Sequence, residues 1–117
     1  MARLKAIEER TLVVRRVAIR SVFGWRPKVD RTLVDVDEGR LSFSASFPVV
    51  ASRLDTPRGA FYIIDGYHRV VEAVLRGDRG IDVVIDPNIP RIERTGGAHA
   101  AFVNDKVNVY DYVSAGL

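Results

Sequence analysis

The sequence contains no cysteine among its 117 residues. Disulfide bonds, thiolate zinc sites and cysteine nucleophiles are therefore excluded from its chemistry. A chain without cysteine is compatible with a reducing compartment, and we expect a cytoplasmic protein. Residues 1–10 lack the apolar segment of a signal peptide, and no hydrophobic run approaches the ~20 residues that cross a membrane. We therefore expect no membrane partner.

Acidic residues are scarce at the start of the chain. Residues 1–31 hold nine Lys or Arg and three Asp or Glu, a balance of +6, whereas residues 32–117 hold nine and twelve, a balance of −3, and together they give the net charge of +3. A basic segment suits a polyanion, so we expect nucleic acid contacts there, and a solvated face without a partner is the alternative. The expected contact residues are Arg16, Arg20, Trp25, Arg26 and Lys28.

The chain has the length and composition of a single domain, residues 1–117, because 47% hydrophobic residues can fill one modest core. Apolar residues at helical spacing predict a helix at 67–76 that ends at Gly77. The expected fold class is α+β, a small mixed sheet with hairpins and one main helix. Period-two and apolar patterns predict strands at 11–21, 32–36, 41–47, 49–53, 60–64 and 81–86, with loops or turns at 23–27, 37–40 and 55–59, while 100–103 and 107–113 fit strand or helix.

The segment Asp65–Arg69, with the sequence Asp-Gly-Tyr-His-Arg, lies between a predicted strand and the predicted helix. The first N–H groups of a helix have no intrahelical partner, and the helix dipole adds partial positive charge there, so phosphate binds well at such an end. We expect Gly66 to form the turn, and His68 and Arg69 to add donors. In the alternative interpretation Asp65 only caps the helix, and Arg69 pairs with Asp65 or Glu72.

Three residues of this segment have a second expected role. Asp65 and His68 are the candidate catalytic residues: Asp65 is a candidate ligand for Mg²⁺ that bridges phosphates, and His68 is a candidate hydrogen-bond donor to phosphate or general acid near neutral pH. Tyr67 either stacks on a base or ribose or packs in the core. His99 is expected to be a surface residue, because no cluster of metal ligands surrounds it in the sequence.

Residues 45–86 resemble the ParB/sulfiredoxin superfamily. The similarity begins with Pro48 and a strand, continues through a hairpin and the Asp-Gly-x-His-Arg motif at Asp65–Arg69, and closes with the helix, Gly77 and a last apolar strand. The resemblance implies a ParB/sulfiredoxin-like fold and phosphate binding through Gly66, Tyr67, His68 and Arg69. It excludes sulfiredoxin chemistry, because Tyr67 stands where that family has its cysteine.

The branches of this superfamily imply different functions. ParB partition proteins bind CTP through a Gly-Glu-Arg-Arg motif and carry a helix-turn-helix, but the motif differs here, and we expect no room for that segment after residue 86. The first expectation is a DNA-associated ParB-like protein that binds nucleotide or nucleic-acid phosphate, with nuclease activity as one form. The alternatives are an ATP- or ADP-dependent kinase of free serine type, with Glu38 as the candidate base, and a non-catalytic nucleotide-binding module, and a homo-oligomer is compatible with each.

Overall fold

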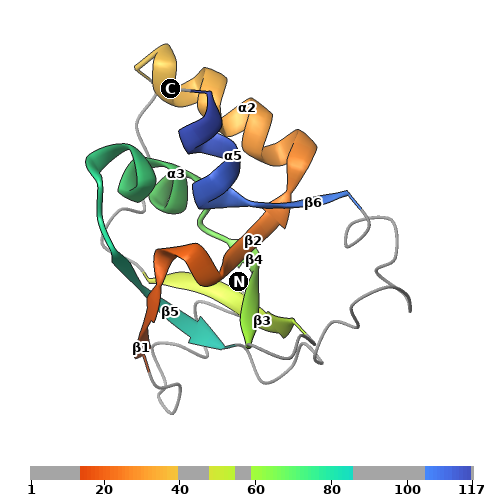
Figure 1. Ribbon diagram of the computed structural model, residues 1–117, viewed down its shortest axis with the longest axis vertical. Coiled ribbons are helices and arrows are strands. Elements are labelled where there is room, and N and C mark those ends of the chain that lie inside the picture. Colours follow the sequence, from red (N-terminus) through yellow and green to blue (C-terminus); the bar gives the residue numbers. More distant parts are fainter. Residues whose placement is uncertain (1–13, 40–47, 55–58, 86–104, 117) are drawn as a thin grey trace.

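The computed structural model describes residues 14–39, 48–54, 59–85 and 105–116 (Figure 1). Several expectations lie outside these residues: the strand at 41–47, most of the turn at 55–59, the segment 100–103 and His99. The described elements are, in chain order, β1 (Val14–Ala18), a 3-10 turn η1 (Ile19–Ser21), β2 (Val22–Trp25), α2 (Arg26–Asp37), β3 (Val49–Leu54), β4 (Ala60–Asp65), α3 (Tyr67–Arg76), β5 (Gly80–Ile85), β6 (Lys106–Asn108) and α5 (Val109–Ala115).

The fold is a small α+β arrangement, as expected from the sequence. The described strands form one mixed sheet in the order β1-β5-β3-β4-β2-β6. The pairs β3–β5 and β2–β4 are parallel, and the other neighbouring pairs are antiparallel. Helices α2, α3 and α5 lie together on one side of the sheet in Figure 1, and α3 packs against both α2 and α5.

The main core lies between the sheet and the three described helices. It is built mostly from valine, a β-branched side chain that suits half-buried strands. Its fully buried members include Val22, Val29, Val49, Val70 and Val109, one from each of five elements. A second, smaller cluster of Leu54, Ala60 and Tyr62, with Phe23, Trp25 and Ile64 packed against it, lies around β3, β4 and β2.

The prediction of helix 67–76 is confirmed, with the same bounds as α3. Val70, Val71 and Val74 are buried at helical spacing, so the helix forms one apolar stripe toward the core. Gly77 ends the helix in a left-handed conformation with a φ of 83°, which favours glycine. The strands predicted at 49–53, 60–64 and 81–86 are also found, as β3, β4 and β5.

Two predictions next to Pro27 are wrong. Residues 23–27 are not a loop, because they hold the end of β2 and the start of α2, and residues 32–36 are not a strand, because they belong to α2. Thr32, Val34 and Val36 are β-branched and favour a strand locally. Tertiary packing overrides this local preference, because the buried Val29 and Thr32 and the partly buried Leu33 and Val36 lie at helical spacing. Pro27 does not prevent the helix, since proline is tolerated in the first turn.

The segment predicted as one strand at 11–21 is also different from expectation. Within the described residues, β1 ends at Ala18, and the 3-10 turn η1 separates it from β2. Arg16 and Arg20 therefore do not share one strand face. In the tail, the segment 107–113, which fits strand or helix by sequence, contains both, because β6 ends at Asn108 and α5 follows it. The Asn108 side chain caps the first turn of α5 by accepting a 3.1 Å hydrogen bond from the Asp111 N–H.

Candidate anion-binding pocket

Two parallel strands end at the same edge of the sheet, and each leads directly into a helix. Strand β2 pairs with β4 in the register Val22 to Phe61 and Phe23 to Tyr62. Helix α2 follows β2 at Arg26, and α3 follows β4 after the single residue Gly66. Ligands of α/β proteins commonly bind at the carboxyl ends of parallel strands, so this edge is a natural place for a site.

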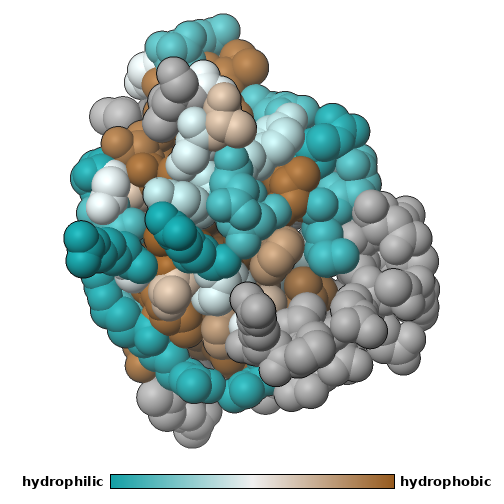
Figure 2. Space-filling model, in the orientation of Figure 1, coloured by the Kyte–Doolittle hydropathy of each residue, from teal (hydrophilic) through white to brown (hydrophobic). Residues whose placement is uncertain are grey.

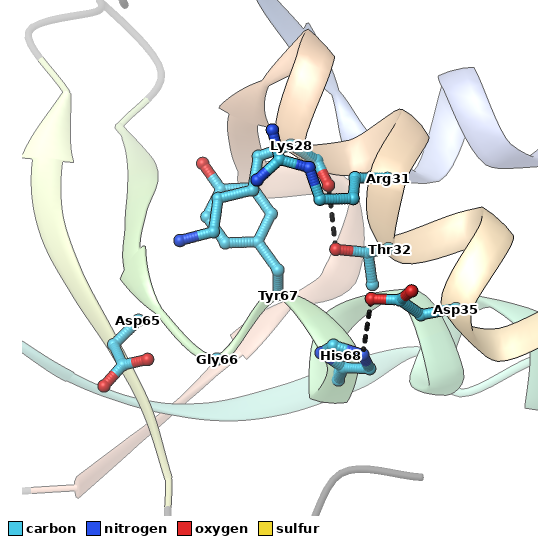
Figure 3. Close-up of a pocket in the computed structure, with 8 residues that line it drawn as sticks. All are labelled: Lys28, Arg31, Thr32, Asp35, Asp65, Gly66, Tyr67 and His68. Atoms are coloured by element: carbon cyan, nitrogen blue, oxygen red, sulfur yellow. Dashed lines mark hydrogen bonds and ion pairs between the residues drawn. The ribbon is translucent and has the colours of Figure 1, made fainter. Parts of the chain in front are cut away.

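A pocket of about 200 Å³ lies at this edge, between α2 and the start of α3 (Figure 3). Helix α2 contributes one polar face to it, because residues three, four and seven positions after Lys28 point the same way. The β4–α3 connection contributes the opposite wall. The residues that line the pocket are Lys28, Arg31, Thr32 and Asp35 on α2, and Asp65, Gly66, Tyr67 and His68 on the connection.

Gly66 fixes the shape of the connection. Its φ is 107°, a region that L side chains rarely adopt, and a Cβ built on it would lie 3.3 Å from the Val49 Cα. Gly66 is the N-cap of α3, and having no side chain it provides no capping bond. The alternative in which Asp65 caps the helix is therefore wrong, and the first N–H groups of α3 have no intrahelical acceptor and no cap from the N-cap residue.

Two cations stand on the α2 wall. Lys28 and Arg31 are both exposed, and neither forms an ion pair with another described residue. The Lys28 ammonium lies 4.9 Å from the centre of the Tyr67 ring, a cation–π contact that holds it over the pocket. The Thr32 hydroxyl donates to the Lys28 carbonyl at 2.8 Å. In Figure 3 the Lys28 and Arg31 side chains lie above Thr32, at the upper side of the pocket.

A histidine and a carboxylate meet at the other end of the pocket. The distance from His68 Nε2 to Asp35 Oδ2 is 3.5 Å, and the two side chains are 33% and 24% exposed. In Figure 3 this pair lies on one side of Gly66 and the Asp65 carboxylate lies on the other side. The carboxylate points away from the His68–Asp35 pair. Asp65 is exposed, and its side chain makes no ion pair or hydrogen bond within the described part of the chain.

Tyr67 is part of the core as well as of the pocket. Its side chain is 6% exposed, and its hydroxyl accepts a 2.9 Å hydrogen bond from the Trp25 N–H and another from the Tyr62 hydroxyl. Burial raises the pKa of Tyr67, and that of Tyr62 as well, so both phenols stay neutral near neutral pH. Gly24 makes room for the ring, since a Cβ there would lie 2.9 Å from Tyr67 Cε2. The structure thus shows the packing alternative for Tyr67.

The five expected nucleic acid contact residues come from four elements, β1, η1, β2 and α2. Arg16 pairs with Asp82 at 3.3 Å, and Arg20 lies 4.4 Å from the centre of the Tyr110 ring. Arg26 binds Asp105 through two nitrogens, at 2.9 and 3.0 Å, and Asp30 at 3.2 Å. Trp25 is partly buried against the smaller hydrophobic cluster. Of the five expected residues, Lys28 lines the pocket.

The expected phosphate residues are divided by the structure. Gly66, Tyr67 and His68 line the pocket, whereas Arg69 is a half-buried residue of the same helix turn that does not line it. Glu38, the candidate base, is the C-cap of α2 and also lies outside the lining. The sequence interpretation missed Arg31, Thr32 and Asp35. Their spacing from Lys28 carried the signal, but it is visible only once residues 26–37 are recognised as a helix.

The described residues contain no group of three or more His, Asp or Glu side chains that could hold a metal ion. Asp65 alone can contribute one carboxylate to Mg²⁺ that is otherwise held by phosphate oxygens, a common arrangement for this ion. That role stays a prediction. In the same described part of the chain, no helix is long and apolar enough to cross a membrane.

No protein-family model matches the chain, and a comparison with curated proteins also finds no match. Among solved structures, the chain is similar to protein Atu1540 from Agrobacterium tumefaciens, with a TM-score of 0.42 and 16% sequence identity over 81% of this chain. The chain spans about half of that protein, 48% of its length. A likeness at this level carries no argument about fold or function.

Proposed function

We propose that this protein binds the phosphate group of a nucleotide in the pocket between α2 and α3. One observation carries the proposal: Lys28 and Arg31 stand, without carboxylate partners among the described residues, opposite the N-terminus of α3, which has no side-chain cap. Both the side chains and the helix end favour negative charge at the same place. Arginine can bind two phosphate oxygens at once, and lysine acts as a point charge.

The size of the pocket limits what it holds. Pockets for drug-sized ligands have volumes of ~300–1,000 Å³, and this one has about 200 Å³. The pocket therefore takes the phosphate part of a nucleotide, while the ribose and base lie outside it. ATP, ADP and CTP are all compatible with this arrangement, and Asp65 is the residue that would hold Mg²⁺, which would neutralise phosphate charge.

The DNA-associated form of the proposal has less support. Nucleic acid binding relies on many cations that neutralise successive phosphates. Three of the expected contact residues already have partners on the protein itself, a carboxylate each for Arg16 and Arg26 and the Tyr110 ring for Arg20. Figure 2 shows hydrophilic residues at the upper right and along the lower left edge of the visible face, with hydrophobic residues exposed between them.

A catalytic form of the proposal is favoured by one specific contact. His68 lies beside Asp35 in the pocket, and a histidine next to a carboxylate is a common acid–base arrangement. In a phosphoryl transfer or phosphodiester cleavage, His68 would exchange a proton with the attacking or leaving oxygen. This covers both the kinase-like and the nuclease-like activities expected from the resemblance to the ParB/sulfiredoxin superfamily.

A thermal-shift panel tests the binding proposal. ATP, ADP, CTP and GTP, each with Mg²⁺, are added to wild type and to the variants Arg31→Ala and Arg79→Ala. A ligand at ~100 times its dissociation constant adds roughly 2.7 kcal/mol, which raises Tm by several degrees in a domain of this size. We expect a shift with at least one nucleotide that is lost in Arg31→Ala.

The matched control is Arg79→Ala, because Arg79 is exposed and lies outside the pocket lining. It should keep the full shift. An equal loss in both variants would mean that bound nucleotide responds to general positive charge, and no shift with any nucleotide would refute the proposal. Release of phosphate or transfer to a hydroxyl acceptor, measured with the nucleotide that binds, separates the catalytic form from simple binding.

A further inference from the structure

The charges that line the pocket cancel one another. On α2, Lys28 and Arg31 are positive and Asp35 is negative, and Asp65 at the end of β4 supplies a second negative charge. The formal sum of these four side chains is zero. The charge of the whole lining near neutral pH therefore depends on its remaining ionisable residue in this pH range, His68.

His68 meets one charged partner across the helix interface. Its Nε2 lies 3.5 Å from Asp35 Oδ2 on α2. Helix α5 and strand β3 also pack against α3, but neither contributes a residue to the pocket. The other charged residues of α3, and the charged residues of β3 and α5, all lie outside the lining: Arg69, Glu72, Arg76, Arg53 and Asp111.

We propose that His68 regulates the affinity of the pocket for anions, and that Asp35 keeps the pocket neutral until His68 is protonated. The inference rests on the proposed function and adds the regulation of the same site. Histidine changes its charge between about pH 5 and pH 8. Once protonated, His68 offsets the negative charge of Asp35. The positive charges of Lys28 and Arg31 then attract the anion, and Asp65 is the one lining carboxylate that still opposes them.

Sulfate is a suitable probe, because it stays doubly charged over this pH range, unlike phosphate. Its binding to the full chain is measured by titration at about pH 8 and about pH 6, where histidine is mostly neutral and mostly protonated. One unit charge near a bound anion changes its energy by about 1 kcal/mol or more, which is roughly fivefold in affinity. We expect wild type to bind sulfate at least about fivefold more tightly at the lower pH, and His68→Gln to lack this gain.

Asp35→Asn separates the charge of Asp35 from its shape. It removes one negative charge from the lining and keeps a side chain of the same size, so at about pH 8 it should bind sulfate roughly fivefold more tightly than wild type. The matched control is Asp37→Asn. Asp37 lies two residues further along α2, is exposed and does not line the pocket, so its variant should bind as wild type does.

The outcomes distinguish this inference from the proposed function. Sulfate affinity that is equal at both pH values, a pH gain that persists in His68→Gln, or no tightening in Asp35→Asn would each overturn the role of the pair and leave the phosphate site standing. Absence of sulfate binding under all conditions also overturns it. The nucleotide panel with Arg31→Ala then decides independently whether the pocket is a phosphate site.

Discussion

The hydroxyl of Tyr67 accepts a 2.9 Å hydrogen bond from the backbone N–H of Trp25. This bond joins the first residue of α3 to the last residue of β2, which is also the N-cap of α2. Helix α2 and the β4–α3 connection form opposite walls of the pocket, so the bond sets the separation of the walls. It also places the Tyr67 ring under Lys28, whose ammonium lies 4.9 Å from the ring centre.

Replacing Tyr67 with phenylalanine should destabilise the protein and widen this junction. The change leaves the Trp25 N–H and the Tyr62 hydroxyl without their acceptor in a partly buried place. Unsatisfied polar groups of this kind cost about 1–3 kcal/mol. We expect a loss of this size in the free energy of unfolding, measured by urea denaturation.

Tyr110→Phe is the comparison variant for this measurement. Its hydroxyl accepts from Arg20 at 3.1 Å at the surface, where water can replace it, so the loss should stay below ~0.5 kcal/mol. If the two variants lose the same stability, the Trp25–Tyr67 bond does not hold the junction together.

The junction also shows where sequence interpretation succeeds. Helix α3 is predictable because local and tertiary signals agree: Val70, Val71 and Val74 have helical spacing, and Gly77 stops the helix. In α2 the signals conflict. Thr32, Val34 and Val36 favour a strand by local propensity. The segment is helical because one face of it, which includes Thr32 and Val36, packs against the core, and a single sequence does not reveal that packing.

This conflict explains why the candidate site was only partly predicted. Gly66 and His68 were found because they sit in one short segment with a physical signature, a glycine at a helix start. Arg31 and Asp35 lie more than thirty residues earlier on α2, and the pairing of β2 with β4 brings them to the pocket. Arg69 shows the reverse, because its place in the motif did not ensure a place in the lining.

Gly66 and Gly77 provide a matched test of the connection. Both have positive φ, 107° and 83°, but a Cβ on Gly66 meets the Val49 Cα at 3.3 Å, whereas a Cβ on Gly77 meets nothing within 4 Å. Gly77→Ala should cost the conformational penalty alone, about 1–2 kcal/mol. Gly66→Ala should cost more, because the Val49 backbone must also move, and it should weaken nucleotide binding by shifting the start of α3.

Urea denaturation of the two alanine variants, followed by the nucleotide thermal-shift panel, checks both statements. Gly77→Ala is expected to keep the ligand-induced shift, since it lies at the far end of α3 from the pocket. Equal losses of stability in the two variants would show that the close approach to Val49 is relieved without cost, and full nucleotide binding in Gly66→Ala would separate the glycine from the site.

The buried tyrosines predict a loss of stability in alkaline solution. Burial raises the pKa of both Tyr62 and Tyr67 above the ordinary value of 10, while the unfolded chain ionises them near about pH 10. The folded chain holds these protons more tightly, so their contribution is complete below about pH 10 and is lost as the pH rises above it toward the folded pKa values. The free energy of unfolding should therefore fall as the pH is raised above about 10. Tyr62→Phe should fall less steeply than Tyr110→Phe over the same range, and parallel curves would mean that Tyr62 ionises in the folded protein as readily as in the unfolded chain.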